Sequence, residues 1–239
     1  MMNNNVTLDE MMRNATAVAR QAGELQLQHW RRGDFDVEEK GRAADIVTQV
    51  DRACEALITD AINRLGDQVG LLGEENGHLR PDAPWQWVVD PLDGTTNYNA
   101  GLPLFSVSIA IRHHGVTMGA VVYAPALDEL FTATRDGGAW LNDQRRLRPS
   151  TVGDLSHAVV STGFPVDKDV NPDNNLAEFS RVLPRVRGIR RLGSAAIDIC
   201  YVAAGFLDAY WEMNLHEWDV AAAELIAAEA GAVTSRYRT

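Results

Sequence analysis

The N-terminal part of the chain carries hydrophobic residues at helical spacing. Between residues 8 and 30, apolar side chains recur every three or four positions, as on one face of a helix, and Gly33 follows as a stop signal. A second amphipathic segment covers residues 48–66. It begins at Thr48, three residues before Asp51, which is the spacing of a capping box with Asp in place of the usual Glu. The sequence therefore predicts two helices at the start of the fold.

After residue 66 the pattern changes to short apolar runs that are typical of strands. These runs are separated by Gly, Pro and Asp turns and cover residues 69–73, 85–89, 105–111, 116–123 and 130–134. His113 and His114 lie between two of the runs, where we expect a hairpin. Helices are predicted over residues 174–186, 194–204 and 219–230, with a short aromatic strand over 208–212. Pro184 interrupts the end of the first of these helices.

The order of these elements indicates the fold class. Helices come first, consecutive strands follow, and mixed elements complete the chain, which favours a layered α+β fold over a regular series of βαβ units. The sequence contains no internal repeat, low-complexity tract or flexible linker. We therefore expect a single domain over residues 1–239, with a soft internal division near residues 149–154.

Composition and charge narrow the classes of function. Hydrophobic residues make up 46% of the 239 positions and charged residues 23%, which excludes a disordered, collagen-like or coiled-coil protein. The net charge of −11 argues against a nucleic-acid partner, because binding of a phosphate backbone needs clustered Lys and Arg. No apolar run approaches the ~18 residues that cross a bilayer, and the first residues lack signal-peptide features, so we expect a cytoplasmic protein. Cys54 and Cys200 both lie in predicted helices, which favours two buried free thiols over a disulfide.

Two carboxylates follow the apolar run at 85–89. Asp90 ends this predicted strand, Pro91 stops it, and Asp93 stands three residues later, before Gly94 and Thr95. Carboxylates this close can share one divalent cation or bridge two, and Mg²⁺ prefers such oxygen ligands. Gly and Thr can then open a helix whose free N–H groups face a phosphate. The alternative is a solvated turn in which Asp93 caps a helix.

Further acidic residues stand at other element ends. Glu74 and Glu75 follow the run at 69–73, Asp219 begins a predicted helix, and Asp45 and Asp51 flank the start of the second helix. Taken singly, each has an ordinary explanation as a solvated turn or a helix cap. The sequence also contains no His-Glu-x-x-His, Walker loop, Gly-x-Gly-x-x-Gly or Gly-x-Ser-x-Gly motif.

Taken together, these segments resemble the inositol monophosphatase family. The resemblance covers about residues 6–233 and rests on motifs that occur in the family's order. They are Gly73-Glu-Glu75, Asp90-Pro-Leu-Asp-Gly-Thr-Thr-Asn-Tyr98 and Trp218-Asp-Val-Ala-Ala with Glu229-Ala-Gly231, supported by Asp45-Ile-Val-Thr-Gln-Val-Asp51, Arg191-Leu-Gly-Ser-Ala-Ala196 and Tyr210-Trp-Glu212.

The resemblance implies a layered αβαβα sandwich of the sugar-phosphatase type and a homodimer. It also implies a lithium-sensitive, Mg²⁺-dependent hydrolysis of a small phosphate monoester, with inositol 1-phosphate as the expected substrate. Family members usually continue with another strand and helix, so we expect either a fold without these final elements or a shortened chain. Ala223 and Ala232 stand where Gly is common in the family, and from these we expect small packing changes only.

The resemblance also assigns roles to individual residues. It implies one cation at Glu74, Asp90 and the Leu92 carbonyl, a second at Asp90, Asp93 and Asp219, and a weaker third supported by Asp51. Glu74 and Thr95 would activate the attacking water, and Gly94 and Thr95 would receive the phosphate. The alcohol part of the substrate would contact Gly193, Ser194, Ala195 and Glu212. In this interpretation part of the net charge of −11 serves to hold two or three Mg²⁺ ions, which offset the charge of the phosphate.

Three alternatives remain open. The same chemistry could act on histidinol phosphate, a 3′-phosphoadenosine nucleotide or fructose 1,6-bisphosphate, although Thr96 stands where the nucleotide-directed relatives often have Lys. A haloacid-dehalogenase-like phosphatase would need Asp-x-Asp, whereas two residues separate Asp90 from Asp93. The third alternative is a metal-binding, dimerising module that has lost its activity.

Overall fold

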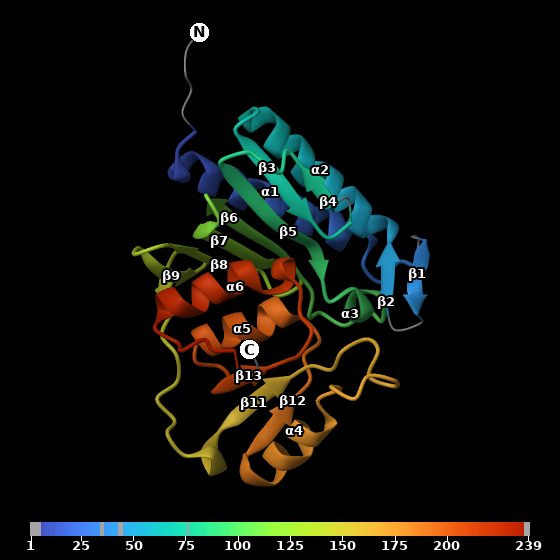
Figure 1. Ribbon diagram of the computed structural model, residues 1–239, viewed down its shortest axis with the longest axis vertical. Helices are drawn as coiled ribbons and strands as arrows, with labels where there is room; N and C mark the ends of the chain where they lie inside the picture. Colours follow the sequence, from blue (N-terminus) through green and yellow to red (C-terminus); the bar gives the residue numbers. More distant parts are fainter. Residues whose placement is uncertain (1–5, 34–35, 43–44, 76, 237–239) are drawn as a thin grey trace.

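The computed structural model describes residues 6–33, 36–42, 45–75 and 77–236, and it has five layers. Helices α1 (Leu8–His29) and α2 (Gln49–Leu65) cover one face of a large sheet, and α5 (Ala195–Ala203) and α6 (Glu217–Ala230) cover the other. A small second sheet follows, with α4 (Leu176–Val182) on its far side (Figure 1). This order of layers confirms the expected αβαβα sandwich.

The large sheet has eight strands in the order β10-β9-β8-β7-β6-β5-β3-β4. Only β3 and β5 run parallel to each other among its described pairs; the other neighbours are antiparallel. Because parallel strands end at the same edge, this pairing brings the residues after β3 next to those at the end of β5. The strand bounds are Val69–Gly73 (β3), Gly77–Leu79 (β4), Trp85–Asp93 (β5), Ser106–His113 (β6), Val116–Ala124 (β7), Glu129–Thr134 (β8), Gly138–Leu141 (β9) and Arg145–Arg146 (β10).

The remaining strands form two smaller sheets. The second sheet of the sandwich has the parallel order β12-β11-β13, and the separate β1–β2 hairpin is antiparallel. Between the two sheets of the sandwich, residues 147–154 form no helix or strand, and the division expected near 149–154 stays a prediction. The bounds are Val37–Arg42 (β1), Asp45–Thr48 (β2), Val159–Thr162 (β11), Gly188–Arg190 (β12) and Ala209–Trp211 (β13).

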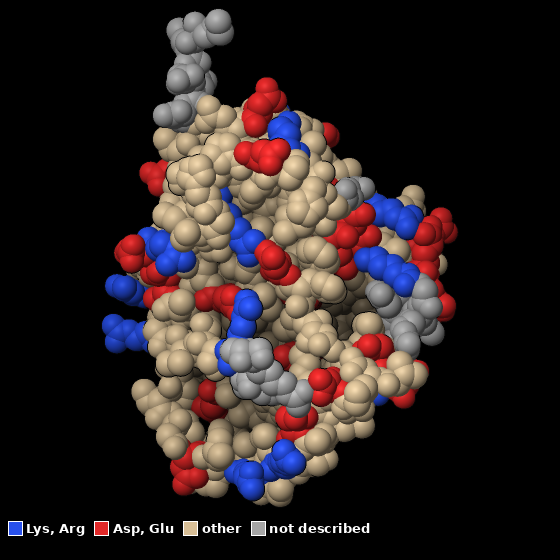
Figure 2. Space-filling view, viewed as in Figure 1, with Lys and Arg blue, Asp and Glu red and all other residues tan. Residues whose placement is uncertain are grey.

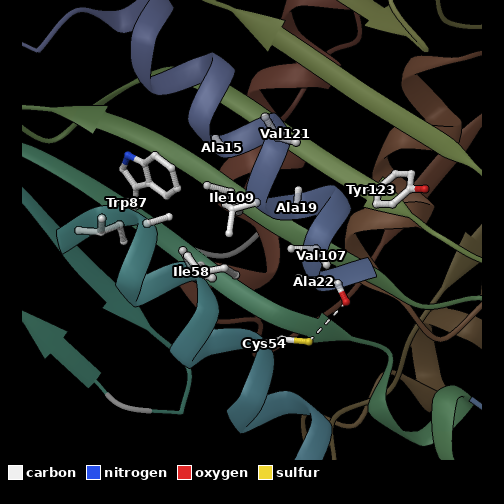
Figure 3. Close-up of a cluster of buried hydrophobic side chains, with 14 of the residues drawn as sticks. Ala15, Ala19, Ala22, Cys54, Ile58, Trp87, Val107, Ile109, Val121 and Tyr123 are labelled. Atoms are coloured by element: carbon white, nitrogen blue, oxygen red, sulfur yellow. Dashed lines mark hydrogen bonds between the residues drawn. The ribbon is translucent and has the colours of Figure 1, made fainter. Parts of the chain in front are cut away.

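Small residues on α1 let this helix pack closely on the large sheet. Ala15, Ala19 and Ala22 are fully buried and lie among the aliphatic side chains of β6 and β7 (Figure 3). The Cys54 thiol donates to the carbonyl of Ala22 over 3.6 Å, which joins α2 to α1. Cys54 and Cys200 are both buried and free, as predicted. No helix in the described ranges has the length and apolar character to cross a membrane.

Several predicted boundaries were wrong for identifiable reasons. Helix α6 begins at Glu217, two residues before Asp219, because His216 takes the position of the N-cap. Helix α4 ends at Val182, and Pro184 lies in a following 3₁₀ turn, since proline lacks the N–H that an α-helix needs there. Strand β13 ends at Trp211, which places Glu212 just beyond it. The β1–β2 hairpin was not predicted at all, because its strands are largely polar.

Candidate active site

Asp90 lies at the centre of the candidate site, near the end of β5. It is only 3% exposed, and its Oδ1 accepts a hydrogen bond of 2.9 Å from the Leu92 amide. The pairing of β5 with β6 shifts its register between Asp90 and Asp93, which turns this end of β5 away from a regular ladder. The bulge therefore allows two acidic side chains three positions apart to serve one site.

The electrostatics around Asp90 are those of closely grouped acids. Burial raises the pKa of Asp90 well above its usual value, and the charges of Glu74, Asp93 and Asp219 raise this pKa further. Buried carboxylates that repel one another are stabilised by a cation between them. The side-chain atoms of these residues that could bind a metal are all carboxylate oxygens, which suits a hard divalent cation such as Mg²⁺. In their ligand chemistry, the residues present therefore suit the metal that the resemblance implies.

The carboxylate of Asp93 caps helix α5. Its Oδ2 accepts 2.6 Å from the Ser194 hydroxyl and 2.8 Å from the Ala196 amide, and its Oδ1 accepts 3.3 Å from the Ala195 amide. Burial raises the pKa of Asp93 to about 6, against the opposing effect of these donors. The predicted substrate contacts Ser194 and Ala195 thus face Asp93, so any contact to the alcohol must use their other atoms.

Glu74 lies opposite a cation supplied by the chain itself. Lys40 of β1 donates to Oε1 of Glu74 over 2.9 Å and to Oε1 of Glu75 over 2.5 Å. Burial alone would lower the pKa of Lys40, but the two carboxylates outweigh it and raise this pKa above its usual value. Because β1 was not predicted, sequence reasoning missed Lys40, which directly contacts one of the proposed metal ligands.

Gly73 of the Gly-Glu-Glu motif makes room for a buried acid. A Cβ atom at Gly73 would lie 1.7 Å from Oε1 of Glu55, whose Oε2 accepts 3.1 Å from the Glu75 amide. Glu55 therefore fixes the backbone that presents Glu74 and Glu75. Its place inside helix α2 gave no motif signal, so this supporting residue could not be found from the sequence.

Asp51 and Thr95 connect helix α2 to the end of β5. The Thr95 hydroxyl lies 3.1 Å from Oδ1 of Asp51 and 3.0 Å from the Leu92 carbonyl, and it can donate to either acceptor. Asp51 also accepts 2.9 Å from the Thr48 amide, which completes the predicted capping box. Burial raises the pKa of Asp51 to about 6. Asp51 therefore caps a helix and borders the site at the same time.

Asp219 approaches the same group from helix α6. It is the third residue of this helix, and its Oδ2 accepts 2.6 Å from the His216 amide. Burial raises the pKa of Asp219 to about 7, and the charge of Asp93 adds to this effect. Asp219 is thus the third helical residue of a capping box and not the N-cap that was predicted, and its role as a metal ligand stays a prediction.

The predicted substrate contacts Gly94, Gly193 and Glu212 come from three separate segments of the chain. A Cβ on Gly94 would lie 3.2 Å from the Gly193 carbonyl. Burial and the charge of Glu212 both raise the pKa of Asp93. Gly94 has φ of +91°, and a Cβ there would lie 2.8 Å from the Leu104 carbonyl, so this close turn requires glycine. Asn97 donates 2.7 Å to both the Leu104 and the Leu192 carbonyls, which holds the chain before Gly193 against α3 (Thr95–Asn99). Burial raises the pKa of Glu212.

Figure 2 shows a hollow over the end of β5 and α3, with acidic side chains near it. A separate cavity of about 520 Å³ lies between α5, α6 and β13, and Glu212 is among its lining residues. Within residues 6–33, 36–42, 45–75 and 77–236, no three His, Cys, Asp or Glu side chains are grouped closely enough to hold a metal ion. The acids are therefore neighbours that interact electrostatically, and Glu74 is engaged by Lys40.

Comparisons with known proteins match nearly the whole chain to one family. Residues 7–238 match the model of the inositol monophosphatase family. An inositol-1-monophosphatase of Rhizobium meliloti is 43% identical over 228 residues, which cover 95% of this chain and 82% of that protein. The Nus factor SuhB of Escherichia coli strain K12 is 44% identical over 229 residues, covering 95% and 85%. The crystal structure of the suhB protein from Bartonella henselae has a TM-score of 0.86 at 40% identity, covering 92% and 85%.

Proposed function

Since this chain belongs to the inositol monophosphatase family, we propose that it is a Mg²⁺-dependent phosphatase of small phosphate monoesters, with inositol 1-phosphate as the expected substrate. Membership of the family supports phosphatase activity in general. The observation that carries the proposal is the burial of Asp90 among Glu74, Asp93 and Asp219, whose charges all raise its pKa. Such a group of acids attracts divalent cations and repels a phosphate anion that arrives without them.

In this proposal Glu74, Asp90, Asp93, Asp219 and the Leu92 carbonyl hold Mg²⁺, with two or three ions at the site. When bound, Mg²⁺ supplies positive charge that offsets the phosphate dianion and makes water more acidic. The net charge of −11 would otherwise repel this substrate. Positioning and electrostatic stabilisation are sufficient for phosphoryl transfer, so the protein needs no covalent nucleophile.

The remaining roles belong to the chain's own side chains. Thr95 lies within hydrogen-bond distance of Asp51, so its hydroxyl can donate to that carboxylate while its oxygen accepts a hydrogen bond from the attacking water and orients it. Glu74 accepts a proton from the same water, and Gly94 lets the backbone approach the phosphate closely. Glu212 accepts hydrogen bonds from hydroxyl groups of the alcohol. The alcohol also contacts Gly193, Ser194 and Ala195.

A panel of substrates tests this function. Phosphate release is measured from inositol 1-phosphate, histidinol phosphate, 3′-phosphoadenosine 5′-phosphate and fructose 1,6-bisphosphate, each with Mg²⁺ and with a chelator. We expect the highest kcat/KM for inositol 1-phosphate. A higher kcat/KM for another compound would make that compound the substrate and leave the proposed Mg²⁺-dependent hydrolysis unchanged. If no compound releases phosphate, the result favours the metal-binding module without activity. A homodimer and a cytoplasmic location remain parts of the same proposal.

A further inference from the structure

Gly163 lies directly against the carboxylate of Glu212. A Cβ atom on Gly163 would be 1.9 Å from Cδ, Oε1 and Oε2 of Glu212, far below any contact that real Cβ atoms make. The φ angle of Gly163 is outside the left-handed region, so alanine would meet no backbone strain at this position. The conflict is therefore purely steric, between one methyl group and one carboxylate.

The backbone of Gly163 is held in place by Asn175. This side chain is 1% exposed, and its Nδ2 donates 2.6 Å to the Gly163 carbonyl and 2.7 Å to the Thr162 hydroxyl. Its Oδ1 accepts 2.7 Å from the Trp211 indole N–H. Withdrawal of Gly163 from Glu212 would break hydrogen bonds between buried groups, which is costly.

The backbone of β13 before Glu212 is fixed as well. Thr162 and Trp211 are partners in the parallel β11–β13 pairing, and the Thr162 hydroxyl donates 2.7 Å to the Trp211 carbonyl. With both backbones fixed, the Glu212 side chain is the part able to move. Its carboxylate accepts a hydrogen bond from the Tyr210 hydroxyl, which any displacement would disturb.

From this arrangement we propose that Gly163 is a specificity-determining position that acts through Glu212. The missing side chain leaves the space that the Glu212 carboxylate occupies, and Asn175 holds that space open. This inference rests on the proposed function, in which Glu212 contacts the alcohol part of the substrate. Gly163 is thus a positioning residue: it makes no contact with the substrate and decides where Glu212 makes one.

A double-mutant cycle tests the proposal. The variants are Gly163→Ala, Glu212→Ala and the combination of both, with Gly153→Ala as the control, because a Cβ at Gly153 meets no atom within 4 Å. The kcat/KM is measured for inositol 1-phosphate and for p-nitrophenyl phosphate, whose alcohol part lacks ring hydroxyls. We expect Gly163→Ala to lower the value for inositol 1-phosphate roughly tenfold, mainly through KM, with a smaller loss on p-nitrophenyl phosphate.

The combination distinguishes positioning from general damage. Removal of the Glu212 carboxylate frees the space for the methyl group, so the double variant should match Glu212→Ala on both substrates. The melting temperature gives a second readout that needs no substrate: Gly163→Ala should lower it by roughly 5 °C in the natural protein and hardly at all beside Glu212→Ala. If Gly163→Ala alone fails to fold, folding of the double variant supports the same steric conflict.

The outcomes separate this inference from the proposed function. Additive losses of stability and of kcat/KM would show that Gly163 does not act through Glu212 and would overturn the inference. If Glu212→Ala lowers kcat/KM equally for both substrates, the proposed role of Glu212 is wrong and so is the assignment of specificity to Gly163. Coupled melting temperatures would then still establish that Gly163 places the carboxylate.

Discussion

Ser194 donates a hydrogen bond of 2.6 Å to Asp93 across 101 positions of the sequence. This bond joins the end of β5 to the first turn of α5, where the Ala195 and Ala196 amides also point at Asp93. The acidic motif and the predicted substrate loop therefore form one connected structure. A substitution at the end of β5 should therefore affect the first turn of α5, and the reverse.

Replacement of Asp93 by Asn should nearly abolish turnover while leaving the fold intact. The amide keeps the shape and one oxygen acceptor for the α5 donors, but it removes a negative charge from the group around Asp90. A lost electrostatic contact of this kind costs about 3 kcal/mol in the transition state. Phosphate release with Mg²⁺ measures the loss, and circular dichroism checks the fold. Turnover at the level of the natural protein would rule Asp93 out as a metal ligand.

The attacking group should be water, with no phosphoenzyme. Single turnover in ¹⁸O-labelled water should place the label in the released phosphate. Rapid acid quench during that turnover, followed by mass spectrometry of the protein, should find no phosphorylated form of Asp90 or Asp93. A phosphorylated side chain at either position would mean that the mechanism is that of a covalent phosphatase.

We expect Glu229 to contribute to the stability of the fold and to have no role in catalysis. Its two oxygens accept 2.9 Å each from the Asp136 and Gly138 amides, which ties the end of α6 to the β8–β9 turn. Glu229→Gln places an amide group against one of these donors, and we expect a loss of about 1–3 kcal/mol in the free energy of unfolding. Glu224→Gln, on an exposed face of the same helix, is the matched control. Equal urea midpoints for the two variants would contradict this role of Glu229.

Asp198 should make stability depend on pH. It is 1% exposed, and burial raises its pKa from 3.8 to about 8. A carboxyl group with a higher pKa in the folded state stays protonated on folding, so stability is greatest at low pH and falls as the pH rises from about 4 to about 8.

The variant Asp198→Asn mimics the protonated acid and should remove this dependence. Between pH 5 and 8, the natural protein should lose up to about 1.4 kcal/mol per pH unit more than the variant. Urea unfolding of both proteins at several pH values gives the difference and cancels the titration of the other groups. Parallel stability curves for the two proteins would mean that Asp198 is ionised in the folded state.

The sequence alone predicted the elements with strong periodicity and the residues that belong to motifs. Helix α2 with its capping box and the strand that delivers Asp90 followed from local patterns. Lys40, Glu55 and Asn175 did not, because their roles depend on contacts between segments that are distant in the sequence. Such residues become visible only when the packing brings their partners together.

The central claim is that the buried acids around Asp90 form a site for catalytic cations. Phosphate release from inositol 1-phosphate, measured against the concentration of free Mg²⁺, tests it most directly. The account predicts no turnover in a chelator, a saturable rise with Mg²⁺, and full recovery when Mg²⁺ is restored. Equal turnover in the presence and absence of the chelator would contradict it.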